Sequence, residues 1–107
     1  MLFSIALFFG GAFFANSIPH LTNGTSGRRF PTPFSRPFGR GESPSWVNVI
    51  WGALNLFLGY LLVFTLGAPE TSLWRALITA GVGGLLFSLY NSWAFGRIYE
   101  MPRGDIQ

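Results

Sequence analysis

The sequence contains no cysteine and no lysine, and few of its side chains carry a charge. Without cysteine the chain has no disulfide, zinc–thiolate site, iron–sulfur cluster or thiol nucleophile. Only 10% of the residues are charged, whereas soluble domains carry about a quarter. Half of the 107 residues are hydrophobic. This composition indicates a surface that faces lipid rather than water.

Groups that catalyse reactions are also scarce. His20 is the only histidine, so a metal site built on it lacks partner ligands. The few carboxylates are too scattered to act as a pair, and no nucleophile elbow or phosphate-binding loop occurs. We therefore expect no enzyme activity, no catalytic residue, no metal site and no required cofactor. The acidic residues are Glu42, Glu70, Glu100 and Asp105.

Three apolar runs predict an all-α integral membrane protein. They cover residues 2–18, 46–66 and 73–97, and none has a charge near its middle. Crossing a bilayer takes about 20 apolar residues in a helix. We expect Pro19 to end the first helix and residues 98–107 to form a tail. The whole chain, residues 1–107, is then a single membrane domain with three transmembrane helices.

Residues 19–45 predict a long irregular loop rich in proline, phenylalanine and arginine. Proline fixes φ and removes a donor, which disfavours a helix or sheet interior. Within residues 27–44 we expect either a partner protein or lipid headgroups to dock, because both accept arginine and aromatic anchors. Nucleic acid is not expected, since it needs a larger basic field. The docking residues would be Arg28, Arg29, Phe30, Phe34, Arg36, Phe38 and Arg40.

Arginine placement predicts the orientation of the chain. Six of the seven arginines fall in the 19–45 loop or near the C-terminus, and only Arg75 lies near the turn between the second and third runs. Basic residues stay on the cytoplasmic side of a membrane. We therefore predict a cytoplasmic loop and C-terminus, with the N-terminus outside.

Small and polar residues predict how the helices pack. Lipid is as apolar as leucine, so close approach and interhelical hydrogen bonds must hold the helices together. We expect the Asn55 amide to bond to Ser88 or Asn91. The packing residues would lie on one face each of the second and third helices: Gly52, Asn55 and Gly59 on one, Gly81, Gly84 and Ser88 on the other.

The same polar residues allow a second interpretation. Asn48, Asn55, Ser88 and Asn91 would line the path of a small homo-oligomeric channel or transporter. The absence of a charged residue inside the spans argues against an ion-coupled transporter. His20 allows two interpretations as well. It would be a pigment or haem ligand, or, as we favour, an interfacial histidine bonded to Asn23 or to a backbone carbonyl.

Parts of the chain resemble a family of short, multi-spanning bacterial inner-membrane proteins that has no activity attached to it. The resemblance implies a bacterial cytoplasmic membrane and adds nothing on mechanism. It rests on Gly27-Arg28-Arg29-Phe30-Pro31-Thr32-Pro33-Phe34, on Gly39-Arg40-Gly41 and on Val47-Asn48-Val49-Ile50-Trp51-Gly52.

A weaker resemblance is to small fluoride channels. It depends on Gly10-Gly11, Val47-Asn48 and Gly83-Gly84 with Phe87-Ser88, which occur in the same order. The chain departs from that family in having no fourth helix, no arginine after Gly10-Gly11 and no Thr-Thr-Phe-Ser run.

We expect an accessory or structural subunit, or a scaffold, of a larger membrane complex. Its partners would be membrane lipids and either other membrane subunits or further copies of itself.

Overall fold

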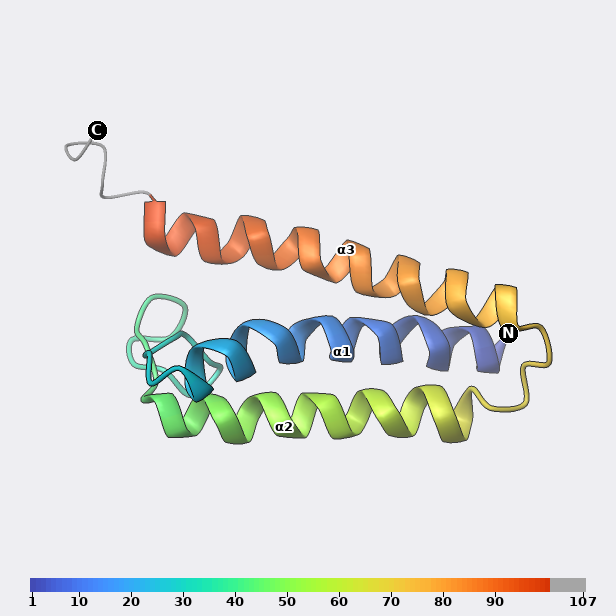
Figure 1. Ribbon diagram of the computed structural model, residues 1–107. Coiled ribbons are helices and arrows are strands. Elements are labelled where there is room, and N and C mark those ends of the chain that lie inside the picture. The colour runs from blue at the N-terminus through green and yellow to red at the C-terminus, as the bar shows by residue number, and fades with distance from the viewer. Residues whose placement is uncertain (101–107) are drawn as a thin grey trace.

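The computed structural model describes residues 1–100 and is built from helices (Figure 1). They are α1 (Leu2–Thr25), α2 (Ser45–Leu61), the π-helical turn η1 (Leu62–Leu66) that continues α2, and α3 (Leu73–Glu100). The spans Leu2–Thr25, Ser45–Leu66 and Leu73–Glu100 are all long and apolar enough to cross a membrane. The expectation of an all-α protein with three such helices is thereby confirmed.

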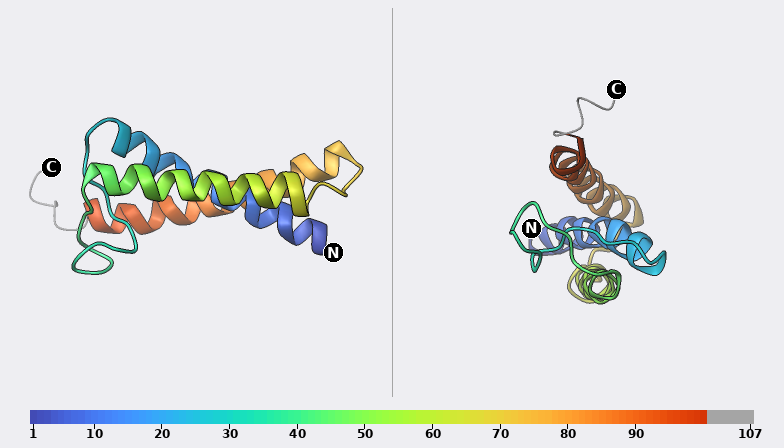
Figure 2. Two further views of the ribbon diagram at one scale, coloured as in Figure 1. Left: turned by 90° about the horizontal axis from the view of Figure 1, so that it is seen from below. Right: turned by 90° about the vertical axis from the view of Figure 1, so that its left-hand side faces the viewer.

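α1 lies between the other two helices. Both α2 with η1 and α3 pack along α1, and α2 and α3 make little or no contact with each other (Figure 2). The segment 26–44 lies at the end where α1 finishes, and the short connection 67–72 lies at the opposite end, near the N-terminus (Figure 1). α3 diverges from α1 toward the end that carries 26–44.

Glycines bring the helix backbones into contact where α1 crosses α3. A Cβ atom added to Gly83 would lie 1.9 Å from the carbonyl oxygen of Phe8, and one added to Gly11 would lie 1.9 Å from the carbonyl oxygen of Ala80. On the other side of α1, a Cβ atom at Gly59 of α2 would lie 3.0 Å from the carbonyl oxygen of Gly10. Small residues permit such close approach between membrane helices.

The face by which α3 contacts α1 differs from the predicted one. Gly84 does lie against Gly11, but a Cβ atom at Gly81 would meet nothing within 4 Å, and Ser88 is exposed. The face in contact with α1 instead contains Ala80 and Gly83. It is shifted by one residue from the predicted face, which is a rotation of about 100° around the helix axis. α3 has small residues on both faces, so their spacing did not identify the one that packs.

The first helix is longer than predicted, because it continues through Pro19 to Thr25. Side chains beyond Pro19 bond back onto helix carbonyls, with Asn23 Nδ2 2.7 Å from the Pro19 oxygen and Thr22 Oγ1 2.7 Å from the Ile18 oxygen. Gly24 packs so closely on α2 that an added Cβ atom would lie 2.8 Å from the Ser45 oxygen. Membrane helices tolerate proline when neighbours satisfy the freed groups.

The predicted irregular loop over 19–45 is therefore wrong in both extent and form. The connection covers only residues 26–44, which we call the cap, and hydrogen bonds fold it. Phe30 and Ser43 pair as an antiparallel bridge, with N–O distances of 3.2 and 2.9 Å. The buried hydroxyls of Thr32 and Ser35 lie 2.6 and 3.0 Å from Ser43 Oγ. Gly39, with φ of 82°, adopts a conformation that side chains rarely reach.

The connection 67–72 is held by side chains at the start of α3. The Ser72 hydroxyl oxygen accepts a hydrogen bond from the Arg75 backbone N–H at 3.3 Å, as a helix cap does. The Glu70 carboxylate accepts one from Arg75 Nε at 2.8 Å. This bond from the guanidinium lowers the pKa of Glu70 below its usual value. At the other end of α3, residues 98–100 of the predicted tail are helical, and residues 101–107 lie outside the described residues.

Replacing Gly83 with alanine should weaken the α1–α3 crossing, because the new methyl group would collide with the Phe8 carbonyl. We expect Gly83→Ala to lower the free energy of unfolding by about 1–3 kcal/mol, as overpacking does. Gly81→Ala is the matched control, since open space surrounds Gly81. The measurement is SDS-induced unfolding of the monomer in mixed micelles, followed by circular dichroism. Equal effects of the two substitutions would contradict the crossing described above.

Candidate functional site

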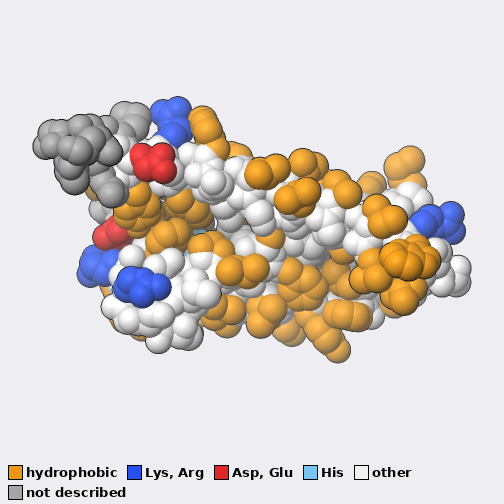
Figure 3. Space-filling view, turned by 45° about the horizontal axis from the view of Figure 1, so that its top comes forward, with side chains coloured by type: hydrophobic (Ala, Val, Ile, Leu, Met, Phe, Trp, Pro, Cys, Tyr) orange, Lys and Arg blue, Asp and Glu red, His pale blue; other side chains and the backbone are white. Residues whose placement is uncertain are grey.

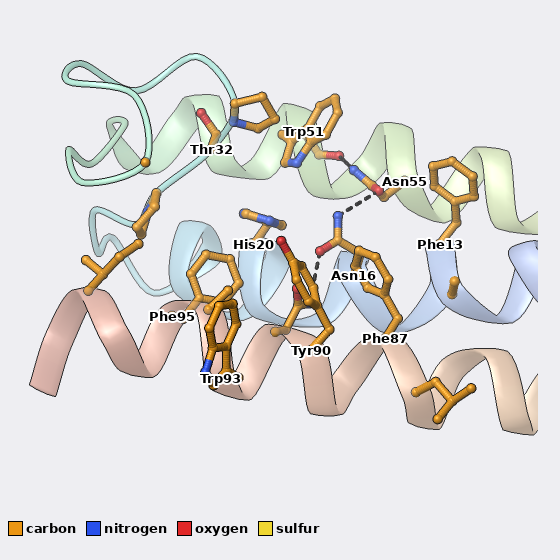
Figure 4. Close-up of a pocket in the computed structure, with 18 of the residues that line it drawn as sticks. Phe13, Asn16, His20, Thr32, Trp51, Asn55, Phe87, Tyr90, Trp93 and Phe95 are labelled. Atoms are coloured by element: carbon orange, nitrogen blue, oxygen red, sulfur yellow. Dashed lines mark hydrogen bonds between the residues drawn. The ribbon is translucent and has the colours of Figure 1, made fainter.

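A groove of about 1270 Å³ runs between α1 and α3, from Phe8 to the cap (Figure 4). Several lining side chains are more than half exposed, including Phe9, Tyr90 and Trp93, so the groove is open on one side. In a bilayer that opening faces lipid. Most of the wall is aromatic or aliphatic, and its polar members are Asn16, His20, Thr32, Arg40, Asn55, Asn91 and Arg97.

Asparagines from all three helices form a line of hydrogen bonds along the wall. Asn91 Nδ2 of α3 donates to Asn16 Oδ1 of α1 at 3.0 Å. Asn16 Nδ2 donates to Asn55 Oδ1 of α2 at 2.9 Å, and Asn55 Nδ2 donates to the Trp51 carbonyl oxygen at 2.7 Å (Figure 4). Asn91 donates only, and Asn16 and Asn55 each accept with the oxygen and donate with the nitrogen. The line therefore has one direction, from α3 through α1 to α2.

Asn16 is the central member of this line, and the sequence reasoning missed it. The expected bond from Asn55 to Ser88 or Asn91 does not form, because α2 and α3 are separated by α1. The signal in the sequence was present, since Asn16 is the only carboxamide in the apolar run 2–18. A carboxamide that cannot reach water needs a partner on a neighbouring helix.

His20 and Asn48 form a second buried pair. Asn48 is fully buried, and its Nδ2 lies 2.9, 3.3 and 3.2 Å from the carbonyl oxygens of Phe30, Ser43 and Pro44. Carbonyl oxygens only accept, so the amide nitrogen must face them and Oδ1 must face His20. His20 Nδ1, 2.8 Å from that oxygen, therefore carries a hydrogen and donates it.

The expected partners of His20 are thus corrected. The ring bonds to Asn48 and not to Asn23, whose side chain instead donates to the Pro19 oxygen and accepts from Arg28 Nε. Because α1 continues past Pro19, His20 lies on a helix and packs inside the protein, with 2% of its surface exposed.

Aromatic rings surround His20. The centroids of Phe30, Phe95 and Trp51 lie 5.5, 6.0 and 6.4 Å from the imidazole centroid, all edge to face. Within residues 1–100 no carboxylate pairs with the ring, and burying an unpaired charge is costly, so the imidazole is neutral. With Nδ1 protonated, Nε2 keeps its lone pair.

Of the three phenylalanines predicted to dock a partner or lipid, one packs into the fold. Phe30 is half-buried, and its ring packs on Phe95 with centroids 4.6 Å apart. Phe34 is 61% exposed and lies edge-on to Trp51, and Phe38 is 79% exposed. Phe30 therefore belongs to the fold, and only Phe34 and Phe38 remain for a partner or for lipid.

The cap arginines are all exposed and lie at one end of the molecule. Arg28 Nε donates to Asn23 Oδ1 at 3.0 Å, and Arg29 Nη2 donates to the Glu42 backbone oxygen at 3.2 Å. Arg36 and Arg40 extend from the tip of the cap. Within residues 1–100 none of these arginines pairs with a carboxylate. Charged side chains gather at the two ends of the molecule, with apolar side chains between them (Figure 3).

The structure places the predicted packing residues of α2 against α1. Gly52, Asn55 and Gly59 are buried, as is Asn48. The proposed channel residues do not lie along one path, because Asn48 and Asn55 take part in separate networks and Ser88 is exposed. In the described part of the chain, no group of three or more His, Asp or Glu residues is arranged to hold a metal ion.

Comparisons with protein-family models, curated proteins and solved structures found no match to this chain.

A double-mutant cycle tests whether Asn16 links all three helices. Asn16→Leu removes both interhelical bonds, whereas Asn91→Leu removes only the bond to α3 and Asn55→Leu only the bond to α2. Such bonds contribute roughly 0.6–2 kcal/mol in membranes. We expect coupling energies of that size between Asn16 and each partner, and none between Asn16 and Asn23. Simple additivity of Asn16→Leu with both partner substitutions would show that the line does not exist.

Proposed function

We propose that the protein is a non-enzymatic accessory or structural subunit of a larger membrane assembly, located in a bacterial cytoplasmic membrane. The observation that carries this proposal is the small internal burial of α3. Within an 18-residue apolar stretch of α3, only 6% is buried inside the protein, against 33% for the corresponding stretch of α1. A helix fixed by one neighbour leaves most of its surface for lipid or for another protein.

The outer face of α3 supports contact with another helix. Gly81, Ser88 and Ser92 are all exposed on the side that α1 does not cover. Small residues on a lipid-facing surface allow a second membrane helix to approach closely. The partner would be another membrane subunit or a second copy of this chain.

The cap supplies a second contact surface on the same protein. Its internal hydrogen bonds order the backbone that carries Phe34, Arg36, Phe38 and Arg40, so little backbone entropy is lost when they bind. Arginines near an anionic membrane surface contribute about 1 kcal/mol each. The cap is thus suited to lipid headgroups, or to a partner's surface at the same level.

The ends of the molecule support the proposed orientation. The cap end carries the four cap arginines together with Arg97, whereas Arg75 lies at the other end with Glu70 (Figure 3). Because basic residues stay in the cytoplasm, the cap and the end of α3 would be cytoplasmic and the N-terminus outside.

Cysteine labelling tests this orientation directly, because the natural chain contains no cysteine. Ser26→Cys places a thiol at an exposed position of the cap, and Thr71→Cys places one at the opposite end. A membrane-impermeant maleimide should label Thr71→Cys in intact spheroplasts and Ser26→Cys only after permeabilisation. The reverse pattern would contradict the orientation.

Purification from the native membrane in a mild detergent tests the assembly. We expect native mass spectrometry to show a particle larger than one chain, and Gly81→Leu to shift most of it to the monomer by blocking the outer face of α3. Ala53→Leu, which puts the same side chain at an exposed position of α2, is the control and should keep the assembly. A wild-type protein that purifies as a lone monomer would refute the proposal.

A further inference from the structure

His20 Nε2 is a polar atom on the groove wall for which the fold provides no partner. His20 Nδ1 is committed to Asn48, and Nε2 has no hydrogen bond within the described residues. In that part of the chain, every fully buried side-chain nitrogen or oxygen has a hydrogen-bond partner. Because Nε2 has none, part of this atom must be accessible. The 2% of His20 that remains accessible lies on the wall of the groove.

The neighbours of His20 fix which kind of group Nε2 can meet. Asn48 can only accept from Nδ1, because its own nitrogen is held by the three carbonyl oxygens around it. Nε2 is consequently an acceptor, and it favours a ligand with an O–H or N–H donor. A buried acceptor left without a donor costs about 1–3 kcal/mol, so a donor that fills the site gains that energy.

The surroundings of Nε2 also limit the size of the ligand group. Three aromatic rings lie within 6.4 Å of the imidazole centroid and cover nearly all of it. A metal macrocycle needs a wide flat surface over the nitrogen, whereas only 2% of His20 is accessible. A single hydroxyl group, with its oxygen about 2.8 Å from Nε2, needs far less room.

The rest of the groove suits an aromatic ring followed by an apolar tail. Trp51, Tyr90 and Phe95 line the groove around the His20 level, and Phe9, Phe13 and Phe87 line it further along (Figure 4). Residues 20 and 9 are about 16 Å apart along α1, at 1.5 Å per residue, which is room for a tail of some ten carbons. His20 itself lies only about 8 Å from the Thr25 end of α1, near the depth at which polar heads meet the bilayer.

We propose that the groove binds the reduced form of a tailed aromatic amphiphile, a hydroquinone or phenol, with its ring hydroxyl donating to His20 Nε2. The site discriminates by hydrogen-bond polarity. An oxidised quinone presents only carbonyl acceptors toward Nε2, as does the ester region of a phospholipid, so neither satisfies it. This ligand site is independent of the assembly proposed above.

The test uses decylubiquinol, its oxidised form decylubiquinone, and the bis-methyl ether of the quinol, which has the same shape without a donor. His20 is the only histidine, so ¹⁵N-histidine labelling reports on a single imidazole in nanodiscs. We expect decylubiquinol to shift the Nε2 resonance upfield and to quench tryptophan fluorescence, since Trp51 and Trp93 line the groove. The quinone and the ether should bind about 5- to 150-fold more weakly, the cost of one unsatisfied hydrogen bond.

His20→Phe removes the acceptor and keeps an aromatic ring in place. We expect it to reduce decylubiquinol affinity to the level of the ether, with an unchanged circular dichroism spectrum. If that variant does not fold, the comparison of the three ligands on the wild-type protein still decides the question. Equal affinity for quinol and quinone, or an Nε2 resonance that does not move, would overturn the proposal. A hemin Soret shift that requires His20 would overturn it in favour of a tetrapyrrole.

Discussion

The hydrogen bonds of Asn16 are the interaction on which the arrangement of the helices depends. In a bilayer the hydrophobic effect does not bring helices together, because lipid is as apolar as they are. α2 and α3 pack on α1 and make little or no contact with each other, so their relative position depends mainly on α1. Close approach at Gly11, Gly59 and Gly83 brings the backbones into register, and Asn16 then bonds to one side chain on each neighbour.

This arrangement leaves a groove, because α3 diverges from α1 beyond the glycine crossing (Figure 1). The divergence exposes the polar line and the edge of His20 to a space lined by aromatic rings. The cap lines one end of the groove with Pro31, Thr32 and Phe38, and Phe30 packs on both His20 and Phe95. Tyr99 adds a bond to Glu42 at 2.6 Å between α3 and the cap. Helix packing, the cap and the groove are therefore parts of one structure, and the outer faces remain available for lipid or a partner.

The sequence predicts the elements well and the contacts between them less well. Apolar runs of the length needed to cross a bilayer identify all three helices, whereas Pro19 does not end the first one, which continues to Thr25 with Gly24 packed on α2. Small residues identify both the inner face of α2 and two faces of α3, and periodicity cannot choose between the two. His20 and Asn48 are 28 positions apart, and only the cap folding onto both helices reveals that they form a pair.

The most direct test of this account is the contact between Asn91 and Asn16 in a bilayer. Solid-state NMR of asparagine-labelled protein in nanodiscs should show a cross-peak between the side-chain Nδ2 of Asn91 and the side-chain carbonyl carbon of Asn16, as the 3.0 Å hydrogen bond requires. The corresponding cross-peak from Asn16 Nδ2 to Asn55 should accompany it. Contact of Asn91 with Asn55 directly, or with neither residue, would contradict an arrangement in which α1 lies between the other two helices.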